Sequence, residues 1–533
     1  SDATSVVIAG ILNKSSTSTM TGNTTINDGA IMNIANSFTH TGDLTVGQSA
    51  SGVVSVNEGV TTAVTGDYTQ TANGIFQLGA SSNSNYGQMT VSGTASFASN
   101  ARFDVDVNTT NTLAVGETFL SVVSAGTVVS DGTFKVTDNS ALFNFTGAIN
   151  GNTIDVFVVD ADSVVEIVER LGPPSALGAA AIFDDWVLNG GDTPEVADVL
   201  QVFGKLETEQ EVADAVESSI PGLSAGVAQA TSSSIKGLTK MINSRQDLLR
   251  GLSSGDDLIA DKNFWIAPYG SWTDQDDRQG VSGYSIDSYG LAMGMDADFS
   301  SRFNLGLSAA YTRSDIDSKL AAGEHNIDVD SYQAKIYATA MLGEFTALNM
   351  QLGGGISNYD SQRKVFTLDV ADVDYDSWHA QFNAELERSI FLKNNVVLTP
   401  YIFADYSYVD VDGYEENGAA ALNLTADDDS DETLIVGLGS KADYLASEDL
   451  LLLVDLSVGY DFMARRSNLT SAFEGGGGQF STEGIKPDEF VYTAGLGFIY
   501  SLDNGSEITG RYDFYGREDF TDQAVSIRLS MLF

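Results

Sequence analysis

The chain has 533 residues, 43% of them hydrophobic, and 73 acidic against 26 basic side chains give it a formal net charge of -47. A surface this acidic repels nucleic acid and argues against a phosphate-binding role. Cysteine is absent, which excludes disulfides, thiolate catalysis and zinc–thiolate sites. The sequence also lacks any run of about 18 apolar residues, which excludes a membrane-spanning helix.

Residues 1–160 are rich in Thr, Ser, Asn and Gly and contain a repeated turn motif. A Thr-Gly pair, or Ser-Gly in the last case, is followed by a polar residue at positions 21–23, 41–43, 65–67 and 92–94. This spacing is typical of a parallel β-helix, in which each rung buries its apolar face only by stacking on its neighbours. Alternating stretches such as 44–46 and 75–78 agree with one buried face per strand. A β-sandwich with irregular turns is the alternative interpretation.

The strand pattern is predicted to stop at the Leu-Gly-Pro-Pro of residues 171–174, and from residue 176 to about 252 the composition becomes helical. Residues 195–206 and 209–218 are expected to form helices, since acidic residues at their starts stabilise a helix N-terminus. Residues 228–252 are expected to form the last helix before the C-terminal half. Several basic side chains stand out in it: Lys236, Lys240, Arg245 and Arg250. They suit either a solvated helix face or a lumen lined with acidic groups.

In the C-terminal half, strands are joined alternately by short and long connections. The short links are residues 300–302, 343–344, 393–395, 447–448 and 503–505, and the long ones are residues 274–283, 315–324, 360–374, 411–431 and 465–487. Transmembrane β-barrels of the outer membrane have short periplasmic turns and long extracellular loops. The alternation therefore predicts about twelve antiparallel strands across an outer membrane, beginning near residues 264, 284, 303, 327, 345, 375, 397, 432, 451, 490, 507 and 523.

The last strand carries the barrel pattern most clearly. Its polar residues, including Arg528, alternate with the apolar residues Val525, Ile527, Leu529, Met531 and Phe533. An apolar outer face and a polar inner face are what lipid outside and a wet lumen inside require. A diffusion porin with an N-terminal extension fits the same pattern.

Several segments of the chain resemble the autotransporters, the type V secretion family of Gram-negative bacteria. In the C-terminal half the resemblance rests on residues 412–419 (Asp-Gly-Tyr-Glu-Glu-Asn-Gly-Ala), 434–441 (Leu-Ile-Val-Gly-Leu-Gly-Ser-Lys) and 472–475 (Ala-Phe-Glu-Gly), and on the terminal aromatic residue. In the N-terminal half, residues 68–78, 86–91 and 93–95 are similar to the last rungs of a pertactin-like passenger. These regions occur in the order of the family, so the resemblance covers nearly the whole chain.

The resemblance implies a mainly β fold: an N-terminal right-handed parallel β-helix, a helical linker, and a C-terminal 12-stranded antiparallel transmembrane β-barrel with a helix in its lumen. The expected domains are a passenger stalk with autochaperone-like rungs (1–170), a helical linker (171–227), a pore-threading helix (228–260) and the barrel (261–533). The residues singled out on the pore helix are Lys236, Lys240, Asn243, Arg245 and Arg250. By the same resemblance, the barrel-assembly machinery would read a signal formed by Val525, Ile527, Leu529, Met531 and Phe533.

On this interpretation the protein is an outer-membrane translocator that exports its own adhesive or structural passenger and anchors it on the cell surface. Its expected partners are outer-membrane lipid, the barrel-assembly machinery, periplasmic chaperones and an unidentified surface ligand. It is expected to act as a monomer, without nucleic acid or cofactor, after removal of a signal peptide. Some family members cut themselves at an Asn-Asn pair in the linker helix. Residues 240–245 read Lys-Met-Ile-Asn-Ser-Arg, so a retained passenger is expected here.

Signals for catalysis or metal binding are weak, so this chain is not expected to be an enzyme. Matches to Gly-x-Ser-x-Gly at residues 222–226 and 251–255 lie in helical or linker sequence, whereas a nucleophile elbow needs a strand before it. The histidines, His40, His325 and His379, are too scattered for a zinc site. The acidic run at 427–432 is expected to be a solvated loop rather than a Ca²⁺ site. An enzymatic passenger upstream of residue 1 is the main alternative.

Overall fold

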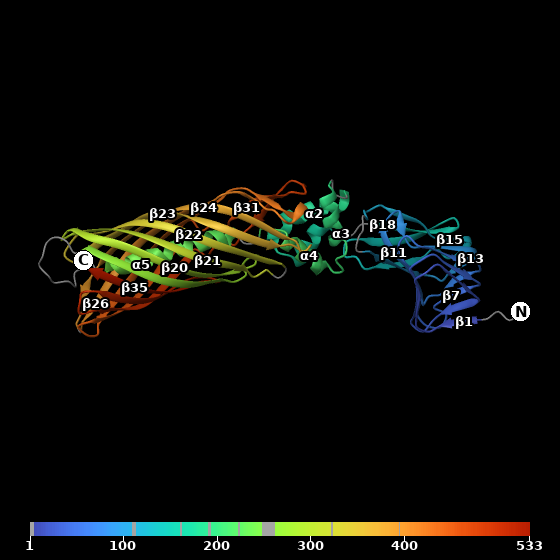
Figure 1. Ribbon diagram of the computed structural model, residues 1–533, viewed down its shortest axis with the longest axis horizontal. Helices are drawn as coiled ribbons and strands as arrows, with labels where there is room; N and C mark the ends of the chain where they lie inside the picture. Colours follow the sequence, from blue (N-terminus) through green and yellow to red (C-terminus); the bar gives the residue numbers. More distant parts are fainter. Residues whose placement is uncertain are drawn as a thin grey trace. The chain divides into compact units, whose positions relative to one another are not determined.

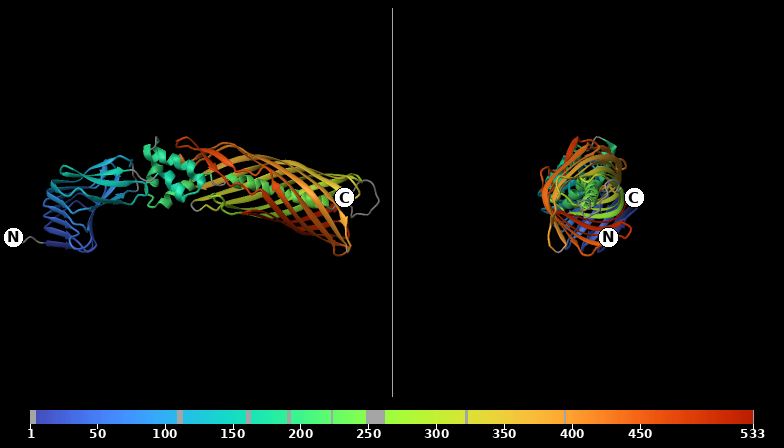
Figure 2. Two further views of the ribbon diagram at one scale, coloured as in Figure 1. Left: turned by 180° about the vertical axis from the view of Figure 1, so that it is seen from behind. Right: turned by 90° about the vertical axis from the view of Figure 1, so that its left-hand side faces the viewer.

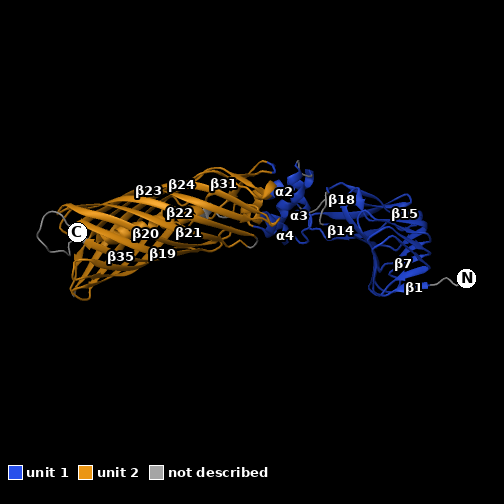
Figure 3. Ribbon diagram, viewed as in Figure 1, with its two compact units in different colours: residues 1–172, 180–216, 475–477 blue, residues 173–179, 217–474, 478–533 orange. Residues whose placement is uncertain are grey.

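The computed structural model describes residues 5–108, 113–159, 163–189, 193–221, 224–247, 262–320, 323–393 and 395–532 (Figure 1). The chain divides into two compact units (Figure 3). The first comprises residues 1–172, 180–216 and 475–477, and the second comprises residues 173–179, 217–474 and 478–533. None of the helices in the described ranges is both long and apolar enough to cross a membrane.

The first unit begins with a stack of parallel strands. Their bounds are β1 (Ser5–Ile8), β2 (Ile11–Lys14), β3 (Ser18–Thr21), β4 (Asn23–Ile26), β5 (Ala30–Ile34), β6 (Phe38–Thr41), β7 (Leu44–Val46), β8 (Gly52–Val56), β9 (Thr61–Val64), β10 (Tyr68–Gln70), β11 (Gly74–Ser82), β13 (Gln88–Phe97), β14 (Ala101–Val107) and β16 (Phe134–Asp138). Successive turns pair in register, so that Ser5 faces Asn23, Leu44 faces Tyr68, and Tyr68 in turn faces Ala95. This parallel pairing confirms the predicted β-helix and rules out the β-sandwich for residues 5–107.

The repeated Thr-Gly motif forms one corner of the β-helix. A Cβ atom on Gly66 would lie 2.4 Å from the carbonyl oxygen of Gly42, so the stacked corners leave room only for glycine. The polar residue after each glycine links the turns, because the amide of Asp67 donates to the Asp43 carboxylate and the amide of Thr94 donates to Asp67, at 3.0 and 2.7 Å. Inside the stack, apolar side chains alternate inward, and rings such as Phe76 and Phe103 lie 5.7 Å apart.

The end of the β-rich region differs from the expectation. β15 (Thr118–Val129) still pairs parallel with β13, but β18 (Thr153–Val159) pairs antiparallel with β15 and with β17 (Asn144–Asn150), and a tight turn at Gly151 joins β17 and β18. The Leu-Gly-Pro-Pro segment was expected to stop strands, but it ends helix α1 (Val164–Leu171), whose N-terminus is capped by Ser163. An Asn-Gly turn and a serine cap are the local signals that the prediction overlooked.

The remaining helices follow in the order expected from composition. They are η1 (Pro174–Ala176), α2 (Leu177–Asn189), α3 (Pro194–Phe203), α4 (Glu209–Ser218) and α5 (Ser224–Gln246). The last of these was expected to begin at residue 228 and instead begins at Ser224. Within the first unit, the helices share a core in which the rings of Phe183 and Phe203 lie 4.8 Å apart.

The second unit is an antiparallel barrel. Its long strands are β19 (Lys262–Gln275), β20 (Tyr284–Ser300), β21 (Phe303–Ser318), β22 (Glu324–Met341), β23 (Thr346–Lys364), β24 (Val370–Arg388), β26 (Val396–Val411), β29 (Asp429–Leu445), β30 (Leu450–Asp461), β33 (Phe490–Ser501), β34 (Glu507–Arg517) and β35 (Phe520–Leu532). The pairings of β19 with β35 and of β24 with β26 close the sheet into a 12-strand barrel, and β25 (Ile390–Phe391) is a short addition. The predicted strand starts are confirmed, with the largest difference at β24.

Side chains alternate across the barrel wall as the sequence predicted. On β35, Ile527 is 57% exposed on the outer face, whereas Arg528 is 3% exposed on the inner face. Two of the long loops do not extend freely, because their strands form a separate sheet at that end of the barrel. This sheet consists of β27 (Tyr414–Glu415), β28 (Leu424–Ala426), β31 (Asn468–Phe473) and β32 (Gln479–Glu483).

One outward-facing row near the long loops consists entirely of aspartates. Directly opposed positions on β20 to β24 are Asp287, Asp315, Asp328, Asp360 and Asp374. Opposed like charges destabilise a strand pair, so this row is tolerated only where water and counter-ions reach it. Part of the acidic excess of the chain therefore lies on the barrel, beyond the lipid-facing band.

Glycines in the wall allow large aromatic rings to lie flat inside the barrel. A Cβ atom on Gly306 would lie 2.2 Å from the Tyr337 ring, and one on Gly294 would lie 2.5 Å from the Trp265 ring. Trp265 and Tyr337 are almost fully buried and also share a hydrogen bond of 3.0 Å between Nε1 and the hydroxyl oxygen. Because the rings lie against the wall, the centre of the lumen stays open for a helix.

We expect Gly306→Ala to lower the stability of the barrel by about 1–3 kcal/mol, because the added methyl group would displace the Tyr337 ring. The temperature at which the folded band on an SDS gel converts to the unfolded band measures this loss. Gly343→Ala is the matched control, since the nearest atom to its new Cβ would be 3.9 Å away. Equal conversion temperatures for the two variants would contradict the packing argument.

A second prediction concerns the stability of the β-helix at acidic pH. His40 is fully buried in the β-helix, with Nε2 2.8 Å from the Thr24 hydroxyl and Nδ1 3.1 Å from the Gly42 carbonyl oxygen. Burial lowers the pKa of His40 from 6.5, so the unfolded chain binds the proton more readily than the folded chain. The His40 contribution to stability is therefore complete above about pH 7 and falls as the pH drops below 6.5.

The measurement compares protease resistance of the β-helix in the parent chain and in His40→Asn between pH 7.5 and pH 5. The parent should lose more resistance than the variant. Burial also raises the pKa of Asp138 to about 6, so protonation of Asp138 stabilises the folded chain as the pH falls. Only the difference between the parent and the variant therefore reports on His40. Identical pH profiles would refute the assignment to His40.

Candidate functional site

Helix α5 lies inside the barrel, surrounded by strands (Figures 1 and 2). Small and polar residues dominate its first half, and nearly all of its described side chains are buried or half-buried. The polar side chains of a buried helix need polar partners, because burying an unpaired polar group is costly. The inner wall of the barrel supplies those partners.

The first half of α5 is held through hydroxyl groups and backbone carbonyls. The Thr231 hydroxyl lies 2.7 Å from the Tyr359 hydroxyl, and the Ser234 hydroxyl lies 2.7 Å from that of Thr312. The side-chain amide of Gln333 donates to the Ser234 carbonyl at 3.0 Å. Short side chains on the helix let these wall residues approach it closely.

The middle of α5 has one apolar face and one basic face. Leu238, Met241 and Ile242 pack in a buried cluster with wall residues that include Trp265 and Tyr337. On another side, the Lys236 ammonium lies 4.1 Å from the centre of the Tyr515 ring. A cavity of about 90 Å³ remains beside this basic face. Since one water molecule needs roughly 10–15 Å³ of such a cavity, the cavity has room for several waters.

The C-terminal end of α5 is fixed by a buried ion pair. Arg245 donates two hydrogen bonds to the Asp296 carboxylate, at 2.9 and 2.8 Å, and both side chains are over nine-tenths buried. Tyr337 also donates to Asp296, at 2.9 Å, so the ring that lies over Gly306 positions the carboxylate. From the wall, Arg528 donates to the Met241 carbonyl at 3.0 Å, where a cation suits the negative end of the helix dipole.

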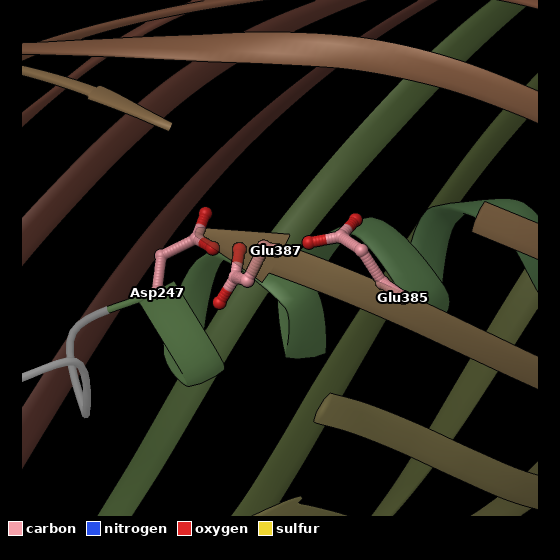
Figure 4. A group of neighbouring side chains, drawn as sticks. All are labelled: Asp247, Glu385 and Glu387. Atoms are coloured by element: carbon pink, nitrogen blue, oxygen red, sulfur yellow. The ribbon is translucent and has the colours of Figure 1, made fainter. Parts of the chain in front are cut away.

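Three carboxylates converge just beyond this end of the helix (Figure 4). Asp247 follows α5, Glu385 and Glu387 project from β24, and their oxygens lie within 4.8 Å of one another. Such an oxygen set could hold a hard cation. The Lys441 ammonium already lies among them, 2.6 Å from Asp247, 2.5 Å from Glu385 and 3.2 Å from Glu387. The cluster therefore acts as an ionic link between wall and helix end.

The residues singled out on the pore helix lie at the helix–wall contact where the structure describes them. Lys236 and Lys240 line the small cavity, Asn243 accepts a hydrogen bond of 2.5 Å from Gln351, and Arg245 pairs with Asp296. Arg250 lies outside the described residues. On β35, Val525, Ile527, Leu529 and Met531 are exposed on the outer face, and the side chain of Phe533 is outside the described residues.

The wall residues that receive α5 were not predicted from the sequence. These are chiefly Asp296, Lys335, Gln351, Lys441 and Arg528. One signal could have found them, because a charged residue at an inward position of a lipid-facing strand needs a partner in the lumen. The partner itself follows only from the strand registers, which place residues far apart in sequence around the same helix turn.

Among the described residues, the side chains that could support catalysis do not form a complete catalytic site. His325 Nε2 lies 3.1 Å from the Ser361 hydroxyl, but its buried Nδ1 has no hydrogen-bond partner among the described residues, so the orienting acid of a triad is missing. Of the two Gly-x-Ser-x-Gly matches, 251–255 lies outside the described residues, as do the side chains of 222–226. The group of possible metal ligands in the described ranges does not include the acidic run 427–432.

Comparisons with known proteins indicate one family for the barrel. Residues 264–513 match the family model described as autotransporter beta-domain. The chain is 27% identical over 275 residues to the esterase EstA of Pseudomonas aeruginosa, an alignment that covers 50% of this chain and 42% of that protein. It is 26% identical over 420 residues to outer membrane protein A of Rickettsia rickettsii, covering 72% of this chain and 18% of that protein. It thus spans less than half the length of these curated relatives.

Among solved structures, the translocator domain of the autotransporter NalP from Neisseria meningitidis aligns with a TM-score of 0.47 and 15% identity, over 57% of this chain and 98% of that one. The family match begins within β19 and ends within β34, so it covers most of the barrel. Given this match and the closed barrel with its inner helix, the C-terminal part of the chain is an autotransporter β-domain, which lies in the outer membrane of a Gram-negative bacterium.

Proposed function

We propose that the barrel exports the N-terminal part of its own chain and then keeps it on the cell surface, with α5 retained in the lumen. The observation that carries the proposal is the buried, polar helix that connects the β-helix to the barrel through the lumen. A helix held by so many wall contacts is a resting state of the pore. The chain N-terminal to it would have passed through the same lumen during export.

The mechanism we propose is physical rather than catalytic. Each β-helix turn buries its apolar side chains only against its neighbours, so a turn that folds outside resists being drawn back. We assign residues 1–170 to the passenger stalk, 171–227 to the linker, 228–260 to the pore-threading segment and 261–533 to the translocator. The outer face of β35 is proposed as the signal for the barrel-assembly machinery, and periplasmic chaperones and outer-membrane lipid are the further proposed partners.

We propose an adhesive or structural passenger that acts as a monomer and binds an unidentified surface ligand. Its support is the likeness to outer membrane protein A of Rickettsia and to a relative described as a putative surface-exposed virulence protein. A second candidate is a translocator for an enzymatic passenger. It is favoured by the esterase EstA and by a relative described as an extracellular serine protease from Serratia marcescens. Hydrolysis of ester and peptide substrates by intact cells would separate these two candidates.

Export predicts that protease added to intact cells removes the N-terminal region and spares the barrel. An antibody to the β-helix should lose its signal after this treatment, whereas an antibody to a periplasmic turn should keep its signal in the whole-cell extract. A periplasmic protein is the control for cell integrity. If the β-helix resists protease until the cells are broken, export has not occurred and the proposal fails.

The retained helix predicts low conductance of the intact chain in planar bilayers. Deleting residues 224–246 should raise the conductance several-fold, because α5 occupies the lumen. Deleting the first β-helix turns, residues 5–42, should leave it low. A diffusion porin is the competing function, and large, steady currents through the intact chain would support that competitor.

We expect Asp296→Asn to increase the frequency of channel openings, because it leaves the buried Arg245 without its charged partner. Removing one partner of a buried pair typically costs about 3–5 kcal/mol, which is enough to weaken the position of α5. Asp298→Asn is the matched control, since Asp298 is exposed on the same strand and does not contact the helix. Similar opening frequencies in the two variants would show that the ion pair does not hold the helix.

A further inference from the structure

The end of the barrel that carries the long loops surrounds the last two residues of α4. Glu217 and Ser218 are buried there, although they precede the lumen helix α5 in the sequence. They contact groups from three separate connections of the barrel, namely those between β19 and β20, between β21 and β22, and between β23 and β24. Long loops face the cell exterior in outer-membrane barrels, so these contacts lie at the outer mouth.

Arg363 is the centre of the contacts. It lies at the end of β23 and is 1% exposed. Its Nε and Nη2 donate to the Glu416 carboxylate at 3.1 and 2.5 Å, and its Nη2 also donates to the Leu422 carbonyl at 2.9 Å. Its Nη1 donates to the Ser218 carbonyl at 3.1 Å. The last carbonyls of a helix lack partners within the helix, so a cation at the end of α4 is favourable.

Other groups at the outer mouth bind the side chains of Glu217 and Ser218. The Phe366 amide donates to the Ser218 hydroxyl at 3.1 Å, and the Ser282 hydroxyl donates to the Glu217 carboxylate at 2.8 Å. A Cβ atom on Gly323 would lie 3.1 Å from the Ser218 Cβ, so glycine at position 323 lets the loop pack closely against Ser218, which is itself buried. Backbone and side chains are therefore both recognised.

A shift of the chain by one residue would lose these contacts. Moving Glu217 into the place of Ser218 would put a long carboxylate into the buried space that the short Ser218 side chain fills. Moving Ser219 there would put Ser218 opposite Ser282, where its shorter side chain could not replace the Glu217 carboxylate. The contacts therefore define a single register of the chain.

We propose that the outer mouth contains a docking site for the Glu217–Ser218 segment of this chain, and that this site fixes the position at which export stops. The loop that carries Glu416, residues 412–428, closes the site, because Glu416 holds Arg363 in the position from which it reaches Ser218. While other parts of the chain pass through the mouth, they offer no Glu-Ser pair in this register. This inference rests on the proposed export function and adds the position in the chain at which export ends.

The absence of cysteine allows a direct test. Ser219 is fully buried, so Ser219→Cys introduces the single thiol of the chain next to the docking site. A maleimide added to the purified, folded chain in detergent should label this thiol slowly. Adding Ser218→Val, which removes the hydroxyl that the Phe366 amide binds and adds a methyl group at a buried position, should raise the labelling rate at least about tenfold. Arg363→Gln should do the same.

Arg313→Gln is the matched control, because Arg313 pairs with Asp328 on the outer face and does not contact the linker. It should leave the labelling rate unchanged. If Arg363→Gln prevents barrel folding, seen as loss of the heat-modifiable band, the comparison of Ser218→Val with the parent decides. Equal labelling of Ser218→Val and the parent in folded protein would overturn the docking site.

Two readouts separate this inference from the proposed function. Protease removal of the β-helix from intact cells reports export, and maleimide labelling of the purified chain in detergent reports docking. A chain that is not exported but still protects the thiol would sink the proposed function and retain the docking site. A chain that is exported with a freely labelled thiol would do the reverse.

Discussion

The structure depends on one constraint, which is that backbone hydrogen bonds within lipid must be satisfied without water. The barrel meets it by pairing β19 with β35, which leaves no free strand edge within the lipid-facing wall. Closure in turn creates an enclosed lumen lined by the inward residues of every strand. Those residues include both apolar clusters and polar groups, so whatever fills the lumen must match both. Helix α5 does so, because Leu238, Met241 and Ile242 pack on the wall while its hydroxyl and basic side chains meet polar wall groups.

Buried charged groups of the second unit lie near both ends of the barrel. Near the short turns, Arg245 and Lys441 connect the helix end to buried carboxylates on the wall. Near the long loops, Arg363 connects the wall, a folded loop and the chain that leaves the lumen. Each link involves a buried charge whose separation from its partner would be costly. The helix is therefore held at its C-terminal end, and the chain just before the helix is held at the opposite end of the barrel, which suits a barrel that has finished moving its chain.

The two units use different ways of ending a β structure. The barrel closes on itself, whereas the β-helix is covered at one end by β17 and β18, which pair antiparallel with each other while β18 also pairs antiparallel with β15. Antiparallel strands share the alternation of apolar residues with the parallel stack, so the alternation alone does not mark where parallel pairing ends. The boundary was visible only in short-range signals, the Asn-Gly turn before β18 and the Ser163 cap of α1.

The barrel, its strand starts, the β-helix and the helical region between them could be predicted from the amino-acid sequence, because these follow from periodicity, loop length and turn chemistry. The amino-acid sequence also pointed to Arg245 and its basic neighbours on the helix, since isolated positive charges stand out in an acidic chain. Tertiary structure alone decided that Asp296 receives Arg245, that Lys441 lies among three carboxylates, and that Arg363 reaches Ser218. These contacts join residues between 51 and 194 positions apart, and strand register, which local sequence does not encode, brings them together.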